Sequence, residues 1–408
     1  MSVVRSAYLS KIIPFIDKPV VKVITGIRRC GKSVLMEQIQ EYLVKKGVQA
    51  ELILSLNFES FTDERVKSFE NVTFAVKLLA DNNAGKKLYL FFDEIQELDG
   101  WEKLINSYLI DFDCDIYITG SNAKLLSGEL ATYLAGRYVE KKLYPFTFSE
   151  SFEALQSLNP SVTAKDAFEI YVNTGGYPFL YNFDFNESQK KQYLDDIFNS
   201  IILKDICNRY KIRDVALLKS LIAFFIANIG NTFSATSLIK YLKNEKRSLS
   251  TETLYNYLEY CKEVCLLHLV PRQNLEGKEL LSTQEKIYVA DHGIRESLFM
   301  KNQKDINQVL ENIVYFYARS RGYRVSVGRI GKLECDFILR DRALDYSYAQ
   351  VAYSITESQK TEDREYRSLE KIRDNYPKYL LTTDYLLQKR NGIRHVNLMD
   401  FIRDGMTF

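Results

Sequence analysis

The chain has 408 residues, of which 46% are hydrophobic and 26% are charged, and its formal net charge is +2. This balance is typical of a globular protein of about two or three domains, and it excludes disordered and fibrous classes. No apolar run reaches the ~20 residues of a membrane-spanning helix, and the first residues lack the basic and apolar segments of a secretion signal. We therefore expect a cytoplasmic protein that makes no membrane contact.

A glycine-rich loop between a strand and a helix is the first chemical motif. Residues 20–24 (VVKVI) predict a buried strand, and Gly26–Ser33 (GIRRCGKS) fits G-x-x-x-x-G-K-[ST], with apolar residues at helical spacing behind it. The backbone N–H groups of such a loop face phosphates, and the helix N-terminus adds positive charge. Lys32 is expected to reach the β- and γ-phosphates, and Ser33 to bind Mg²⁺. The expected nucleotide contacts are Gly26, Ile27, Arg28, Arg29, Cys30, Gly31, Lys32, Ser33 and Val34.

An acidic pair follows the next buried strand. Residues 88–92 (LYLFF) predict that strand, and Asp93 and Glu94 come directly after it. Asp93 is placed to hold Mg²⁺ through water, and Glu94 to orient and deprotonate the water that attacks the γ-phosphate. Because the pair lies downstream of a phosphate loop, it strengthens the prediction of a nucleotide-hydrolysing site.

Two further segments predict side chains near the nucleotide. A third strand at residues 115–119 (DIYIT) precedes Ser121 and Asn122, and ligands of parallel sheets bind at the carboxyl ends of the strands. One of these two side chains is expected at the γ-phosphate or the water; a plain polar turn is the alternative interpretation. Arg137 lies in the segment LAGRY, and is either an arginine finger that stabilises transition-state charge or a structural salt-bridge partner.

These motifs resemble, in order, those of a large family of predicted prokaryotic AAA+ ATPases that join an ATPase domain to a C-terminal domain of unknown function. The segments that carry the resemblance are VITGIRRCGKS, LYLFFDEIQEL, IYITGSNAKLL and LAGRYVEKKLYPFTFSE. The resemblance implies a parallel sheet with helices on both faces, hydrolysis of ATP to ADP with Mg²⁺, and a homo-oligomer. By the same resemblance, Asp93 and Glu94 match the Walker B pair. Asn122 or Ser121 matches the sensor, and Arg137 the arginine of the G-R motif.

The middle of the chain predicts helices followed by a hairpin. An amphipathic helix at 191–210 follows the core, and helices at 232–245 and 250–264 precede two strands, which is a winged-helix pattern. A winged helix often binds DNA through its second helix, but this one is not basic, so packing against protein is an equal alternative. We expect an α/β fold in four parts: a P-loop AAA+ core (1–150), a helical lid or linker (151–212), a winged helix (213–290) and a PD-(D/E)XK-like domain (291–408).

The last of these parts predicts a cluster of polar side chains at one end of a sheet. A helix at 308–319 carries Glu311, and the strands that follow carry Glu334, Asp336 and Gln350. If the strands pair, these side chains converge. The arrangement resembles a restriction-endonuclease-like PD-(D/E)XK core.

The residues of this resemblance depart from the motif of an active nuclease. Asp336 matches the Asp, but Gln350-Val-Ala352 stands in place of (D/E)-X-K, so one carboxylate and the lysine are missing. That mechanism needs two acids to hold Mg²⁺ and a lysine to assist the attacking water. Lys332 and Lys360 are the near candidates for a migrated lysine. We therefore predict a vestigial site in a domain that binds rather than cuts.

Three functions fit this pattern. The leading one is an ATP-hydrolysing AAA+ switch or motor that acts through its winged-helix and endonuclease-like half, on DNA. The second is an ATP-regulated DNA-processing nuclease, and the third is a scaffold that holds nucleotide with little turnover. The intact set of Lys32, Ser33, Asp93 and Glu94 favours turnover, and the excess of basic side chains in the second half of the chain permits contact with DNA.

Overall fold

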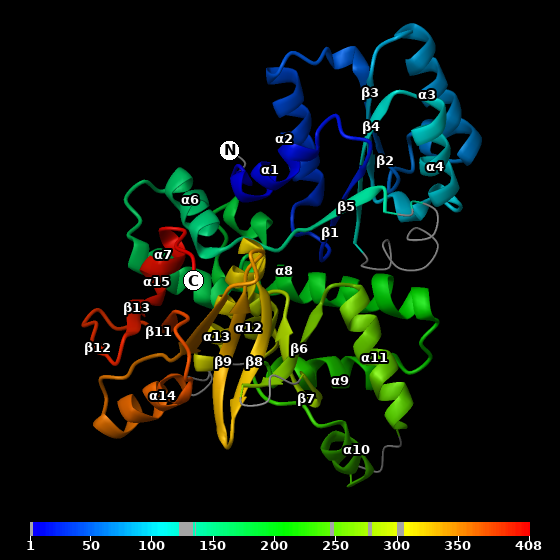
Figure 1. The fold of residues 1–408 in the computed structure, drawn as a ribbon. Helices are drawn as coiled ribbons and strands as arrows, with labels where there is room; N and C mark the ends of the chain where they lie inside the picture. Colours follow the sequence, from blue (N-terminus) through cyan, green and yellow to red (C-terminus); the bar gives the residue numbers. More distant parts are fainter. Residues whose placement is uncertain (1–2, 122–133, 135, 245–248, 276–279, 300–305) are drawn as a thin grey trace. The chain divides into compact units, whose positions relative to one another are not determined.

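Two compact units make up the chain. The computed structural model describes residues 3–121, 134, 136–244, 249–275, 280–299 and 306–408. The N-terminal unit comprises residues 2–143 with 263–265, and the C-terminal unit comprises residues 144–262 with 266–408. Figure 1 shows both units, coloured along the sequence. Within the described ranges, no helix has the length and apolar character needed to cross a membrane.

A five-stranded parallel sheet forms the N-terminal unit, in the order β2-β3-β4-β1-β5. Its strands are β1 (Val21–Thr25), β2 (Ile53–Asn57), β3 (Leu88–Asp93), β4 (Cys114–Gly120) and β5 (Tyr138–Lys142). β1 and β3 are buried at every position, as is typical of parallel strands that are covered on both faces. The parallel sheet predicted from the sequence is therefore confirmed.

Helices cover both faces of this sheet. They are α1 (Ser6–Ile12), α2 (Lys32–Lys45), α3 (Phe69–Asn82) and α4 (Trp101–Asp111). Figure 1 shows α1 and α2 on one side of the sheet and α3 and α4 on the other. Val72 and Val76 of α3 and Trp101, Leu104 and Ile105 of α4 pack with the strands in one hydrophobic cluster. Burial of this apolar surface is the main force that holds the layers together.

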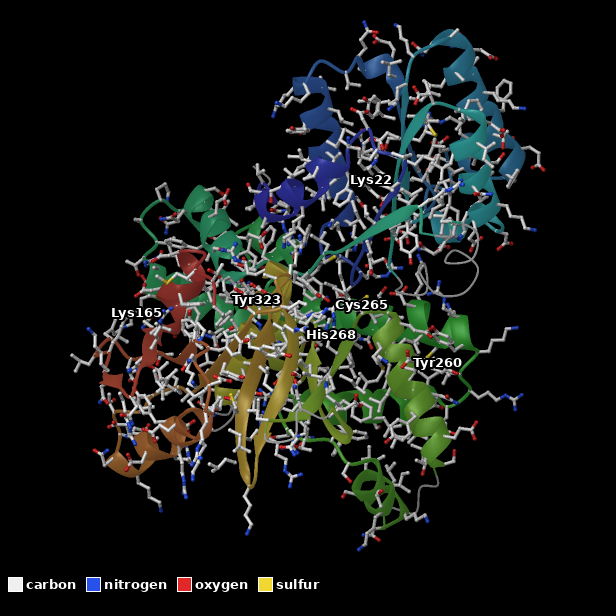
Figure 2. All side chains as sticks on the ribbon, in the orientation of Figure 1. Lys22, Lys165, Tyr260, Cys265, His268 and Tyr323 are labelled. Carbon is white, nitrogen blue, oxygen red and sulfur yellow. The ribbon has the colours of Figure 1, made fainter. Side chains whose placement is uncertain are left out.

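A buried ion pair lies inside the sheet. Lys22 of β1 contacts Asp115 of β4, both are enclosed, and Tyr117 donates a hydrogen bond to Asp115 at 2.8 Å. Figure 2 labels Lys22 among the side chains of this unit. Because removal of either partner would leave an uncompensated buried charge, the pair fixes β1 beside β4.

An eight-stranded mixed sheet forms the centre of the C-terminal unit, in the order β12-β13-β11-β10-β9-β8-β6-β7. Its strands are β6 (Leu267–Asn274), β7 (Leu280–Val289), β8 (Arg324–Ile330), β9 (Leu333–Arg340), β10 (Tyr346–Val351), β11 (Lys378–Thr382), β12 (Lys389–Arg390) and β13 (Ile393–Asn397). β6 and β7 form the expected antiparallel hairpin, but β6 also pairs in parallel with β8. The boundary expected at residues 290/291 therefore does not separate two sheets, because the hairpin continues the sheet of the last segment.

The described part of the C-terminal unit also contains ten α-helices. They are α6 (Phe148–Leu158), α7 (Ala164–Thr174), α8 (Glu187–Ser200), α9 (Val215–Ala227), α10 (Ala235–Asn244), α11 (Thr251–Glu263), α12 (His292–Leu298), α13 (Ile306–Arg321), α14 (Gln359–Lys371) and α15 (Leu398–Arg403). Of these helices, α9, α12, α13, α14 and α15 contact the sheet. α8 continues as a π-helix over Ile201–Asn208, so the helix expected at 191–210 is present in two geometries.

The helices at 151–212, for which the sequence predicted a helical lid or linker, belong to the C-terminal unit. Asp291, which caps α12, accepts a hydrogen bond from the backbone N–H of Gly176 at 2.6 Å. His292 bonds through Nε2 to the carbonyl of Tyr171 at 2.8 Å. Since both contacts are buried, they tie α7 and the turn after it to α12, which is the physical reason why these helices belong to the C-terminal unit.

Candidate functional site

The phosphate loop connects the end of β1 to the start of α2. Gly26 has a φ of +155°, and a Cβ there would lie 2.3 Å from the carbonyl oxygen of Leu143, so only glycine fits. Gly31 caps α2 with a φ of +99°, a left-handed conformation that favours glycine. Ile27 and Cys30 are buried.

The outer side of the loop carries its more accessible side chains. Arg28 forms an ion pair with Glu59 at 3.3 Å. The exposed side chains of the loop and the first turn of α2 are Arg29, Ser33 and Val34. The loop thus keeps its apolar side chains inward and its helix terminus accessible, as a phosphate site requires.

Lys32 is buried and held by groups from the loop and two strand ends. Its Nζ lies 3.3 Å from the carbonyl oxygen of Gly26, 2.9 Å from Ser121 Oγ and 3.1 Å from Glu94 Oε1. Burial lowers the pKa of Lys32, but the charge and hydrogen bond of Glu94, together with the smaller effects of Cys30 and Asp93, raise this pKa above its usual value. The ammonium therefore stays charged in a place where a phosphate can replace the carboxylate.

Asp93 receives hydrogen bonds from three elements. Ser33 Oγ donates to Asp93 Oδ2 at 2.6 Å, Asn57 Nδ2 donates to the same oxygen at 3.2 Å, and Thr119 donates to Oδ1. Burial raises the pKa of Asp93 above its usual value, and the bonds from Ser33 and Thr119 only partly oppose it. The structure thus brings together Ser33 and Asp93, the two residues expected to bind Mg²⁺.

Ser33 and Asp93 fit Mg²⁺ by the chemistry of their donor atoms. Mg²⁺ prefers oxygen ligands, and proteins hold it with one or two side chains together with water and substrate phosphates. No cluster of three or more His, Cys, Asp and Glu side chains in the described ranges could hold a metal by itself. Two oxygens beside a phosphate loop therefore suit Mg²⁺ that is shared with a nucleotide.

Glu94 is oriented by side chains on both sides of the loop. Ser121 Oγ donates to Glu94 Oε1 at 2.7 Å, and Gln96 Nε2 donates to Oε2 at 2.6 Å. Burial opposes ionisation, but the charge of Lys32 and the hydrogen bonds from Gln96 and Ser121 prevail and lower the pKa of Glu94 to about 2. In this arrangement the carboxylate is ionised and is a weak base.

Of the two residues weighed as the sensor, Ser121 lies in the site, where it contacts both charged side chains. Asn122 falls outside the described residues. The sequence interpretation missed Asn57 and Thr119, which hold Asp93. Asn57 ends β2 and Thr119 lies one residue before the end of β4, so the carboxyl-end rule that pointed to Ser121 also applied to them.

Arg137 directly precedes β5, which pairs with β1. It therefore lies at the amino-terminal ends of these strands, whereas the phosphate loop lies at their carboxyl ends. The carbonyl of Arg137 accepts a hydrogen bond from Val21 N at 2.8 Å, at the start of β1, and its side chain is exposed. β1 is 5 residues long, which is about 16 Å at ~3.3 Å per residue. An arginine side chain is shorter than this, so Arg137 does not reach phosphates bound by its own subunit. Action in a neighbouring subunit and a structural role are the interpretations that remain.

A second polar cluster lies in the C-terminal unit. Glu311 of α13 and Asp336 of β9 converge on Lys286 of β7, whose Nζ lies 2.8 Å from Glu311 Oε1 and 3.5 Å from Asp336 Oδ1. Glu334 Oε1 lies 2.8 Å from the same Nζ, and Tyr288 donates a hydrogen bond to Glu311. We call Lys286, Glu311, Glu334 and Asp336 the Lys286 cluster.

Gln350 contacts Asp336 of the Lys286 cluster through a hydrogen bond. Its Oε1 accepts from the backbone N–H of Asp336 at 3.3 Å, and its Nε2 donates to Glu365 at 3.2 Å. The lysine that faces the acids is Lys286, which the sequence interpretation missed. Lys332 and Lys360, the lysines it considered, are exposed. No motif spacing pointed to Lys286, because it precedes the helix of the motif altogether.

Two family matches divide the chain. Residues 18–152 match a family described as an AAA domain, which spans the phosphate loop, the acidic pair and Arg137. Residues 165–305 match a domain of unknown function (DUF8612), which spans most of α7 and continues through the β6–β7 hairpin to α12.

The chain is similar over its whole length to other proteins. It is 37% identical over 399 residues to an uncharacterized protein of Haemophilus influenzae, with 98% of each chain covered. It is 32% identical over 368 residues to an uncharacterized protein of Methanocaldococcus jannaschii, with 86% of this chain and 78% of that one covered. Among solved structures, the Orc1 protein of Aeropyrum pernix in complex with DNA is 12% identical with a TM-score of 0.31, over 72% of this chain and 90% of that chain. That score is too low to carry an argument.

We expect Lys32→Met to change how stability depends on pH. In the parent, the pKa of Glu94 is about 2, below its usual value of 4.5, so its ionised form stabilises the fold above about pH 4.5 and this contribution is lost as the pH falls toward 2. Without Lys32, only the hydrogen bonds from Gln96 and Ser121 oppose the effect of burial, so the pKa of Glu94 rises and its ionised form stabilises the variant less. The difference in melting temperature between parent and variant should therefore shrink between about pH 7 and pH 4.

Lys45→Met is the matched control for this measurement. Lys45 is exposed on α2 and forms a surface pair with Glu41. The difference in melting temperature between Lys45→Met and the parent should stay nearly constant between about pH 7 and pH 4. If the difference in melting temperature between Lys32→Met and the parent is also constant over this pH range, Lys32 does not set the ionisation of Glu94.

Proposed function

We propose that this chain, which belongs to one family with the Haemophilus influenzae protein and has a P-loop ATPase domain of the AAA type, hydrolyses ATP with Mg²⁺ as a switch or motor. The observation that carries the proposal is the meeting of three groups at one sheet edge. They are the phosphate loop with Lys32, the Ser33–Asp93 contact at 2.6 Å, and Glu94 at 3.1 Å from Lys32. Each is needed for phosphoryl transfer to water, and their proximity supports this reaction.

Nucleotide binding requires Lys32 to exchange its partner. The ammonium that now faces Glu94 turns toward the β- and γ-phosphates, while the loop N–H groups receive the remaining phosphate oxygens. Ser33 and Asp93 would hold Mg²⁺, which would supply positive charge to the same phosphates. The contacts of Asn57 and Thr119 keep Asp93 in place during this exchange.

The same exchange activates Glu94. With Lys32 beside it, the carboxylate has a pKa of about 2 and accepts a proton poorly. Once the ammonium turns to the phosphates, burial raises the pKa of Glu94 toward the range of a general base. Ser121 and Gln96 hold the carboxylate in position to take the proton of the attacking water. ATP binding thereby switches on the base that hydrolyses it.

Glu94→Gln is expected to keep ATP binding and to lower turnover by roughly 10²–10⁴-fold, because the amide cannot accept the proton of the water. Lys32→Ala should weaken binding and abolish turnover, because the phosphates lose their main cation. Steady-state phosphate release and nucleotide titration measure both properties.

Glu97→Gln is the control, because it makes the same chemical change at an exposed side chain three residues further on. Its turnover should equal that of the parent. If Glu94→Gln also hydrolyses ATP at the parent rate, Glu94 is not the base.

If Arg137 is an arginine finger, it stabilises the transition state of a nucleotide bound by a second copy of the chain. This version of the proposal requires a homo-oligomer. Support comes from the exposure of Arg137 and its distance from the loop of its own subunit.

Arg137→Ala should then lower turnover by about 10³-fold. Mixing this variant with Lys32→Ala should restore part of the activity, because one copy supplies the arginine and the other an intact loop. The mass of the parent at saturating ATP, measured by size-exclusion chromatography with light scattering, is the accompanying test. A monomer under all nucleotide conditions contradicts this role.

The C-terminal unit is proposed as the effector, in the cytoplasm, with DNA as a partner. The order α10, α11, β6, β7 supports a winged helix. The convergence of Glu311 and Asp336 beside β10 supports an endonuclease-like core. The contact of β6 with β8 favours one combined module over two separate domains.

Two alternative functions can be distinguished from the proposed ATPase switch or motor by experiment. A DNA-processing nuclease would cut DNA, and a low-turnover scaffold would bind ATP without steady hydrolysis. The ATPase rate with and without double-stranded DNA separates a scaffold from a DNA-stimulated motor. The intact Lys32, Asp93 and Glu94 set favours turnover.

The C-terminal unit is predicted not to cut DNA, because Gln350 lacks the second carboxylate of the motif. Supercoiled plasmid incubated with the protein in Mg²⁺ or Mn²⁺, with and without ATP, should stay intact. Asp336→Ala is the control that separates intrinsic cleavage from a contaminant. Nicking by the parent that disappears in Asp336→Ala would establish the nuclease alternative.

A further inference from the structure

Three carboxylates surround one buried ammonium in the Lys286 cluster. The Lys286 side chain is 3% exposed, and those of Glu311 and Asp336 are 11% and 10% exposed. Nζ lies within 2.8 Å of oxygens from Glu311 and Glu334 and 3.5 Å from Asp336. Oxygen atoms from a helix and a strand thus point to the one position that Nζ occupies.

Neighbouring groups hold the carboxylates in this orientation. Arg272 donates to Glu334 Oε2 at 2.8 Å, and the backbone N–H of Val351 donates to Asp336 Oδ2 at 2.9 Å. Because the second oxygens are bound elsewhere, Glu334 and Asp336 turn their first oxygens to Nζ. Three carboxylates therefore face one ammonium, and with Lys286 in place the acidic side chains of the described residues do not form a metal site.

A divalent metal does not fit this site while the ammonium is present. Carboxylate oxygens bind Mg²⁺ at about 2.1 Å, and one position cannot hold both cations. Burial lowers the pKa of Lys286, but Glu311, Asp336 and Glu334 outweigh it and raise this pKa above its usual value. Burial, together with the charge of Glu311, raises the pKa of Asp336 above its usual value. The Arg272 guanidinium, paired with Glu334 at 2.8 Å, adds a second positive charge beside the ammonium.

We propose that Lys286 is a built-in cation that takes the place of a divalent metal in the endonuclease-like centre of the C-terminal unit. It fastens the β6–β7 hairpin to α13 and β9 and leaves no position for a metal. The proposal rests on the endonuclease-like assignment for its comparison with a metal site, and it is independent of ATP hydrolysis. Its consequence is specific: removal of the ammonium leaves three hard oxygen donors, which should then bind a divalent cation.

The test compares thermal unfolding of full-length Lys286→Ala and parent in EDTA and in Mn²⁺, without nucleotide. In EDTA, Lys286→Ala should melt roughly 10 °C below the parent, because buried carboxylates lose their counter-charge. Mn²⁺ should recover about half of this loss or more, because it binds only the folded cluster. Adding Asp336→Asn to Lys286→Ala should abolish the recovery. Lys332→Ala, an exposed lysine on the turn before β9, should behave as the parent.

The parent itself supplies the measurement that does not depend on folding of the variant. Parent and Asp336→Asn should respond to Mn²⁺ alike, since neither is expected to hold a metal at this centre and the phosphate loop is common to both. A rise in melting temperature with Mn²⁺ that is present in the parent and absent in Asp336→Asn would overturn the proposal. A folded Lys286→Ala that Mn²⁺ does not stabilise would overturn it as well. Neither outcome bears on the ATPase assignment.

Discussion

The nucleotide site depends on the register of a parallel sheet. Parallel strands bring their carboxyl ends to one edge, so that residues far apart in the sequence meet there. Asn57 of β2 pairs with Asp93 of β3, and β1 delivers the phosphate loop to the same edge. A shift of β3 by one residue would turn Asp93 to the other face of the sheet and away from Ser33. The contacts of the site therefore follow from strand pairing as much as from the loop.

Two buried lysines are kept charged by the same electrostatics with different results. Carboxylates outweigh burial around both Lys32 and Lys286. Lys32 faces Glu94 and loop carbonyls beside an accessible helix terminus, so a phosphate can take over its charge. Lys286 faces three carboxylates from α13 and β9, which no single ligand replaces. The first arrangement suits an exchange of partners, and the second a permanent fastening.

Local patterns were sufficient for most of the N-terminal unit. The apolar runs at 20–24 and 88–92 predicted β1 and β3 within a residue of their observed ends. Thr119 was missed because its signal is its place at a strand end rather than its residue type. The unit to which the helices of the predicted lid or linker belong could not be read from such local patterns. A boundary depends on which faces pack together, and the hydrogen bond from Gly176 to Asp291 joins segments far apart in the chain.

By itself, the sequence determined those groups whose chemistry depends on chain neighbours: the loop that presents Lys32 and Ser33, and the acidic pair that ends β3. Only the tertiary structure decided which distant residues complete each centre. Lys286 precedes Glu311 by 25 residues, and it reaches the acids because β7 pairs with β6 and β6 pairs with β8. No spacing along the chain encodes this approach, because it arises from pairing between separate segments. The buried carboxylates then require a cation, and the fold places Lys286 among them.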